Sequence, residues 1–148
     1  MKGAFLLNFV KFVEWPVQAY KSPADPIAIC LLGANPFGPG LAQAAHGTVV
    51  EKRNVEVRQI ADPQQAHGCQ IVFVGASERK RVRAVMEATK GASVLTVGES
   101  EGFIAGGGVI QFWVEESKVK MEISAEAAKR AGLHISAKLL NLSQAAKQ

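Results

Sequence analysis

Several features that would assign a chain quickly to a functional class are missing from this sequence. No apolar run approaches the roughly 18 residues of a membrane-spanning helix, and the longest run, residues 4–13, is interrupted by Asn8 and Lys11. Internal repeats, low-complexity segments and interdomain linkers are also missing. The composition, 48% hydrophobic and 20% charged over 148 residues, is typical of a folded globular domain. We therefore expect one domain over residues 1–148 that does not itself span a membrane.

Positive charge is in modest excess and is dispersed along the chain. The net charge is +4 and the pI is near 9.2, and the one dense basic stretch covers residues 79–83. Nucleic-acid-binding domains generally carry a denser basic face that is interleaved with aromatic side chains. The sequence therefore predicts no nucleic-acid partner.

The motifs that would indicate catalysis or cofactor binding are incomplete. Residues 33–39 have the glycine spacing of a phosphate loop but lack its lysine and its serine or threonine. His46, His67 and His134 fall in separate turns, without the spacing of a metal site. No serine or cysteine lies in a nucleophile-elbow pattern. The sequence thus predicts no enzyme, no catalytic residue, no cofactor and no metal.

Three apolar runs indicate the centre of a sheet. Ile27–Leu32, Ile71–Val74 and residues 94–97 have strand length and show no regular polar alternation. Such runs are typical of parallel strands that helices cover on both faces. Val55 and Val57 alternate with charged residues instead, which predicts a half-exposed strand.

Helix and turn signals complete the predicted fold. Helices are expected at about residues 3–14, 41–45, 78–90, 125–131 and 136–142, with Ser77 and Ser124 as N-caps. Residues 109–114 and 119–123 flank a polar turn and predict an antiparallel hairpin. We expect a three-layer α/β domain with a mixed, mostly parallel sheet, a C-terminal hairpin and flanking helices. It would be Rossmann-like without the dinucleotide fingerprint, since the glycines at 106–108 precede a strand.

Ser77, Arg79, Lys80 and Arg81 form a basic cluster at the start of the third predicted helix. The helix dipole disfavours cations at this end. One interpretation is a solvated helix end in which Glu78 offsets part of the repulsion. The other is a contact for an anion or an acidic partner, where helix amides and cations converge.

Cys30 lies in the first predicted central strand, and Cys69 lies at the start of the second. If these strands are neighbours in a parallel sheet, a disulfide between the two cysteines is feasible. Two buried free thiols are an equally good interpretation of the residues alone.

Six segments in order along nearly the whole chain carry a resemblance to a known family. They are residues 4–16, 31–38, 69–74, 94–97, 106–112 and 123–140. Together they resemble the YfiR family of small periplasmic regulators. The resemblance implies export to the periplasm, with a signal peptide that is cut away before the present Met1. It also implies a Cys30–Cys69 disulfide, because both cysteines align with a paired position of the family.

The resemblance further implies a function. The protein would bind the periplasmic region of an inner-membrane diguanylate cyclase and inhibit it, which controls cyclic-di-GMP and biofilm formation. Self-association is expected as well, with a two-fold homodimer as the default. The second cysteine pair of the family has no counterpart in this sequence.

Ile135, Leu139 and Leu142 are the candidate partner-binding residues. They give the terminal segment a more apolar pattern than a solvent-facing end requires. The alternative is that they lock the last helix onto the core.

A second function, small-ligand binding, is kept beside the first. Its pocket would lie beyond the carboxyl ends of the parallel strands. The polar candidates there are Asn35, Ser77, Arg79 and Ser100. The glycines at 106–108 either allow a close backbone approach before the next strand or belong to a ligand-facing loop over residues 103–108.

Overall fold

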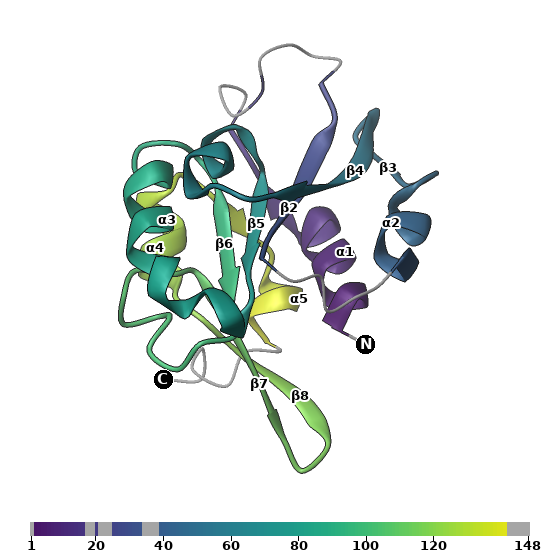
Figure 1. The fold of residues 1–148 in the computed structure, drawn as a ribbon. Coiled ribbons are helices and arrows are strands. Elements are labelled where there is room, and N and C mark those ends of the chain that lie inside the picture. The colour runs from purple at the N-terminus through teal and green to yellow at the C-terminus, as the bar shows by residue number, and fades with distance from the viewer. Residues whose placement is uncertain (1, 17–19, 21–24, 34–38, 142–148) are drawn as a thin grey trace.

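The computed structural model describes residues 2–16, 20, 25–33 and 39–141. The strands of its main sheet are β2 (Ile27–Leu32), β3 (Val49–Val50), β4 (Arg53–Ile60), β5 (Ile71–Val74), β6 (Leu95–Gly98), β7 (Ile110–Glu115) and β8 (Lys118–Ile123). They are ordered β3-β4-β2-β5-β6-β7-β8 (Figure 1). The four inner pairs are parallel, whereas the outer pairs β3–β4 and β7–β8 are antiparallel. The predicted mixed, mostly parallel sheet is confirmed.

The three apolar runs form the centre of this sheet, as predicted. Every residue of β2, β5 and β6 is buried. Strands covered on both faces have no solvent-facing positions, which explains the missing polar alternation. The prediction differs only at the third run, because β6 covers Leu95–Gly98 and is therefore shifted by one residue from the predicted 94–97.

Helices flank the sheet and bury one core on each of its faces. They are α1 (Lys2–Phe12), α2 (Pro39–Ala45), α3 (Val82–Thr89), α4 (Ala125–Arg130) and α5 (Ala137–Leu140), with 3₁₀ helices η2 (Pro63–Gly68) and η3 (Ala76–Arg81). Alternate residues of β2 belong to the two cores. Ile29 packs in the core that contains Phe9 of α1. Cys30 packs in the core that contains Val85 of α3.

The first helix ends earlier than the sequence predicts. Helix α1 stops at Phe12, and Val13–Glu14 form the short strand β1. This strand pairs antiparallel with β9 (His134–Ile135) in a separate two-stranded sheet. The backbone N–H of Ser136 also donates to the Phe12 carbonyl, 2.8 Å away. The predicted helical turn at residues 13–14 is wrong because pairing with a distant segment requires extended backbone.

The helix predicted after Ser77 begins later and has no side-chain cap. Ser77 is exposed within η3, the N-cap of η3 is Gly75, and α3 starts only at Val82. The predicted role of Ser77 as an N-cap is therefore wrong. A 3₁₀ helix aligns side chains three residues apart, and Glu78 and Arg81 use this spacing for an ion pair of 3.0 Å.

The N-cap predicted in the C-terminal part, Ser124, is confirmed. The Ser124 hydroxyl accepts a hydrogen bond from the Ala127 N–H at 3.1 Å. Gly132 follows α4 with a φ of +76°, a conformation that glycine adopts without strain. Helix α5 covers only Ala137–Leu140 of the helix predicted at residues 136–142.

Candidate functional site

The structure joins Cys30 and Cys69 in a disulfide. Cys30 lies in the middle of β2, and Cys69 directly follows η2, whose Ala66 packs in the same core as Cys30. Their Cα atoms are 6.2 Å apart, within the range that disulfides require. The bond links the end of η2 to the sheet and closes a loop between cysteines that are 39 residues apart in the sequence. This outcome confirms the predicted pairing.

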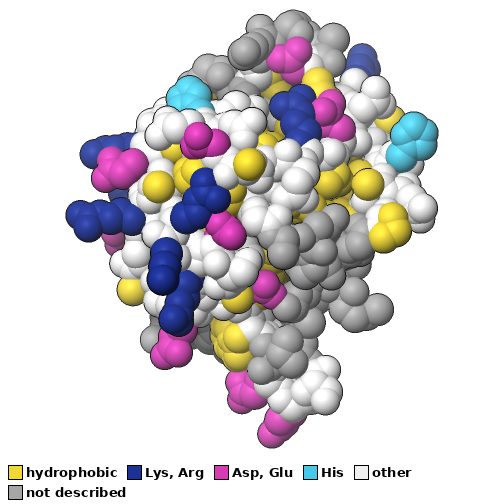
Figure 2. All heavy atoms as spheres, in the orientation of Figure 1, with side chains coloured by type: hydrophobic (Ala, Val, Ile, Leu, Met, Phe, Trp, Pro, Cys, Tyr) yellow, Lys and Arg dark blue, Asp and Glu magenta, His cyan; other side chains and the backbone are white. Residues whose placement is uncertain are grey.

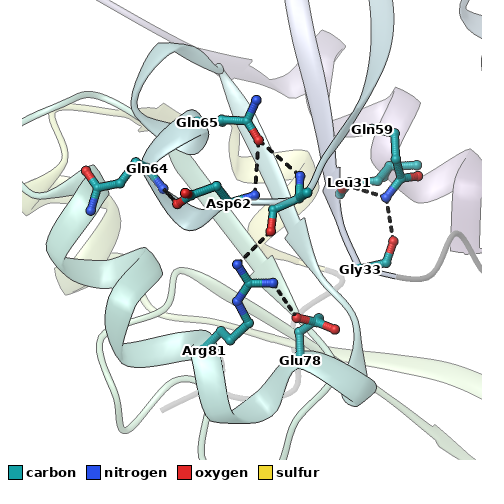
Figure 3. A network of polar contacts seen from close by, with 9 residues as sticks. Leu31, Gly33, Gln59, Asp62, Gln64, Gln65, Glu78 and Arg81 are labelled. Carbon is teal, nitrogen blue, oxygen red and sulfur yellow. Dashed lines mark hydrogen bonds and ion pairs between the residues drawn. The ribbon is translucent and has the colours of Figure 1, made fainter.

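A polar network holds the loops at the carboxyl edge of the sheet (Figure 3). Arg81 donates to Glu78 Oε1 at 3.0 Å and to the Ala61 carbonyl at 2.6 Å. The Gln59 amide donates to the Leu31 carbonyl at 2.9 Å and to the Gly33 carbonyl. This network connects η3 with the ends of β2 and β4. Arg81 therefore has structural partners and differs in this respect from the neighbouring cations.

Part of the predicted basic cluster lines a cavity of about 780 Å³ at this edge. Arg79 and Lys80 contribute to its wall, together with Arg83 from α3. Ser100, which follows β6, also lines the cavity. The structure thus brings Arg79 and Ser100 together as expected, while Ser77 is not among the lining residues. Asn35 lies outside the described residues.

The loop after β6 is folded around Phe103. This side chain is 1% exposed and also lines the cavity. Its ring occupies the space in front of Gly98 and Gly108, where any added Cβ atom would collide with it. Close approach of the aromatic ring to the backbone explains glycine at position 108. Gly106 lines the cavity together with Phe103, so the same loop also faces the cavity.

A second cavity lies at the opposite, amino edge of the sheet and has a volume of about 660 Å³. Tyr20, Arg58, His67 and Gln70 are among its lining residues. Burial raises the pKa of the Tyr20 hydroxyl, and the Arg53 guanidinium, 3.5 Å above the ring centre, opposes this rise. Sequence reasoning missed this cavity because its residues come from five separate segments of the chain.

The three histidines do not converge. His46, His67 and His134 are all exposed and lie near α2, in η2 and in β9. Within residues 2–16, 20, 25–33 and 39–141, no group of three or more His, Cys, Asp or Glu side chains is arranged to hold a metal ion. No helix in these same ranges is long and apolar enough to cross a bilayer.

The candidate partner-binding residues have different environments. Leu139 is 1% exposed and packs in the core that contains Leu6 and Phe9. Ile135 is half-buried in β9, against the edge of the same core. Leu142 lies outside the described residues. The burial of Leu139 favours the packing interpretation for this one residue, whereas a partner-binding role of the segment stays a prediction.

Large apolar side chains are scarce on the described surface. Val49, at 58% exposure, is the one large hydrophobic residue that is exposed in the described part of the chain. Figure 2 shows Lys and Arg side chains gathered on the side of the molecule that bears α3 in Figure 1.

Comparison with known proteins places this chain in a family. A solved structure of a conserved domain protein from Vibrio cholerae O1 biovar El Tor strain N16961 is similar, with a TM-score of 0.58 at 12% identity. The match covers 80% of this chain and 54% of that one, so this chain spans about half the length of its structural neighbour, and the likeness shows the fold alone. The model of the YfiR/HmsC-like family matches residues 1–144 and confirms the resemblance seen in the sequence. The chain therefore belongs to the YfiR/HmsC-like family.

Proposed function

We propose that this protein is a periplasmic regulator that binds the periplasmic region of an inner-membrane diguanylate cyclase and holds the cyclase inactive. The observation that carries this proposal is the family match over residues 1–144. A regulator of this kind acts by contact alone and turns over no nucleotide. Loss of the protein then raises cyclic-di-GMP and promotes biofilm formation.

The disulfide supports the proposed compartment. Disulfides persist in oxidising environments such as the periplasm and are rare in the cytosol. The Cys30–Cys69 bond links buried segments on one face of the sheet. Reduction of this bond should therefore loosen the packing of η2 against β2.

The proposed contact surface comprises β9 and α5, together with the adjoining β1. Ile135 supplies a half-buried apolar side chain, and His134 and Lys138 are exposed beside it. Leu139 lies beneath this surface and fixes α5 to the core. An apolar centre with a polar rim is the usual composition of a protein–protein contact.

Self-association into a two-fold homodimer is part of the proposal. Among the described strands, β8 pairs only with β7 and leaves one edge of the main sheet open. An open strand edge offers backbone donors and acceptors to a second chain. Light scattering coupled to gel filtration would return twice the 15.8 kDa mass of the chain for a dimer.

Affinity capture from envelope membranes tests the binding function. Oxidised protein is immobilised and incubated with solubilised inner membranes, and a Lys138→Glu variant serves as the matched surface change. The proposal expects the native protein to retain a diguanylate cyclase and the variant to retain less of it. Capture of no cyclase by either form, from membranes with measurable cyclase activity, would contradict the proposal.

A further inference from the structure

The cavity at the carboxyl edge of the sheet has the composition of a ligand site. It lies between η3 and α3 on one side and the loop after β6 on the other, with a volume of about 780 Å³. This volume is within the usual range for small-molecule pockets. Its wall combines cationic and apolar side chains, because Arg79, Lys80 and Arg83 lie beside Val82, Met86 and Phe103.

The three cations of this wall are not neutralised by the fold. Among the described residues, Arg79, Lys80 and Arg83 take part in no ion pair or hydrogen bond of their side chains, whereas Arg81 is paired with Glu78. Glu87 and Glu101 also line the cavity, and both are exposed. The three cations are exposed as well and outnumber the two carboxylates of the wall, so the wall favours an anion.

A buried hydroxyl in the same cavity also has no partner. Ser100 is 9% exposed, and its Oγ atom has no hydrogen-bond partner among the described residues. An unsatisfied buried polar group costs about 1–3 kcal/mol. Such groups are rare in native folds and call for an explanation, such as an absent ion or ligand. A hydroxyl donates readily to an anionic oxygen.

We propose that this cavity binds a small organic anion with an apolar portion. Its carboxylate or phosphate group contacts Arg79, Lys80 and the Ser100 hydroxyl, and its apolar portion packs against Met86 and Phe103. The unpaired cations and the unused hydroxyl select the anionic group of such a ligand. The apolar wall selects its apolar portion. This site does not depend on binding of the cyclase.

Titration of ¹⁵N-labelled protein, followed by amide chemical shifts, tests this site directly. The probes are hexanoate and hexyl phosphate, with 1-hexanol, hexylamine and inorganic phosphate as controls for the two halves of the ligand. The proposal expects saturable shifts for residues 79–87 and 99–106 with both anions and weaker binding of every control. Tighter binding of hexanoate indicates a carboxylate ligand, and tighter binding of hexyl phosphate indicates a phosphate ligand.

Matched variants separate the site from general charge. Arg79→Glu and Lys129→Glu change the net charge equally, but Lys129 is exposed on α4 and does not line the cavity. Arg79→Glu should weaken hexanoate binding by about tenfold or more, the size of one charge-assisted hydrogen bond. Ser100→Ala should weaken it about three- to tenfold without lowering the melting temperature, because the hydroxyl it removes has no partner.

Three results would overturn the proposal. One is equal affinity for 1-hexanol and hexanoate, which would mean that the anionic group does not contribute to binding. Another is equal affinity for inorganic phosphate and hexyl phosphate, which removes the apolar wall. The third is an affinity of Arg79→Glu within about twofold of that of Lys129→Glu, which is a negligible free-energy difference.

Discussion

The ring of Phe103 lies where a side chain on Gly98 would stand: a Cβ atom added there would be 2.5 Å from Phe103 Cδ1. Gly98 is the last residue of β6, and Phe103 is nearly fully buried. The loop after β6 can therefore pack Phe103 in this position only because residue 98 is glycine. Because Phe103 also lines the carboxyl-edge cavity, this relationship shapes the cavity wall.

Gly98→Ala should destabilise the protein by about 1–3 kcal/mol, the usual cost of overpacking a core. Urea unfolding followed by circular dichroism measures this change. Gly40→Ala is the matched control, since a Cβ atom at position 40 in α2 would meet nothing within 4 Å. The control should leave stability unchanged or raise it slightly. Equal effects of the two substitutions would contradict the packing of Phe103 against Gly98.

Removal of the disulfide should lower stability by about 4 kcal/mol, as the chain-entropy model gives for the 39-residue separation. The Cys30→Ala/Cys69→Ala variant and the reduced native protein should both show this loss in urea unfolding. Intact mass spectrometry supplies the control, because the oxidised chain is two hydrogens lighter. A native protein with the mass of the fully reduced chain would contradict the bond.

Arg81 should matter for stability, whereas Arg83 should not. Arg81 donates to Glu78 and to the Ala61 carbonyl, so Arg81→Ala should cost about 1 kcal/mol, as expected for partly exposed polar contacts. Arg83 has no such partner among the described residues and should change stability little when replaced by alanine. Thermal unfolding of the two variants side by side checks this difference. A larger loss for Arg83→Ala would contradict the network.

Substitutions at Leu139 and Ile135 should distinguish a role in core packing from a role in partner binding. Leu139→Ala should destabilise the protein by about 2–5 kcal/mol, because it empties a fully buried position. Ile135→Ala should cost less, because this side chain is half-buried, and should weaken cyclase inhibition in the folded protein. Val49→Ala, an exposed apolar position in the edge strand β3 of the main sheet, is the control for inhibition. If the Ile135→Ala variant inhibits the cyclase as strongly as the Val49→Ala variant does, β9 is excluded from the contact.

The central strands could be predicted because strands that are buried on both faces appear in the sequence as apolar runs without polar alternation. β2 and β5 begin and end at the predicted residues. The hairpin of β7 and β8 could also be predicted, because a polar turn at Glu116 and Ser117 separates two segments of strand-forming residues. In these elements local preference and tertiary packing agree.

The short elements could not be predicted because distant segments decide them. β1 exists only through its pairing with β9, and η3 follows the contacts of Glu78 and Arg81. For η2 a local signal was present and overlooked: Asp62, Pro63 and Gln65 form a capping box with proline in the first turn.

The candidate site was predictable in part. The position of a cavity at the strand ends follows from parallel topology, and Arg79 and Ser100 line it as expected. The roles of Arg83 and Phe103 depend on how the loop after β6 folds against α3. No local sequence pattern encodes this contact.

Inhibition of the cyclase is the most direct test of the proposed function. The cyclase with its periplasmic region is reconstituted in vesicles with that region accessible, and its production of cyclic-di-GMP from GTP is measured while oxidised protein is added. We expect a saturable fall in this rate, and no cyclic-di-GMP from the protein alone. An unchanged rate at saturating protein, with a cyclase that remains active and accessible, would contradict the account.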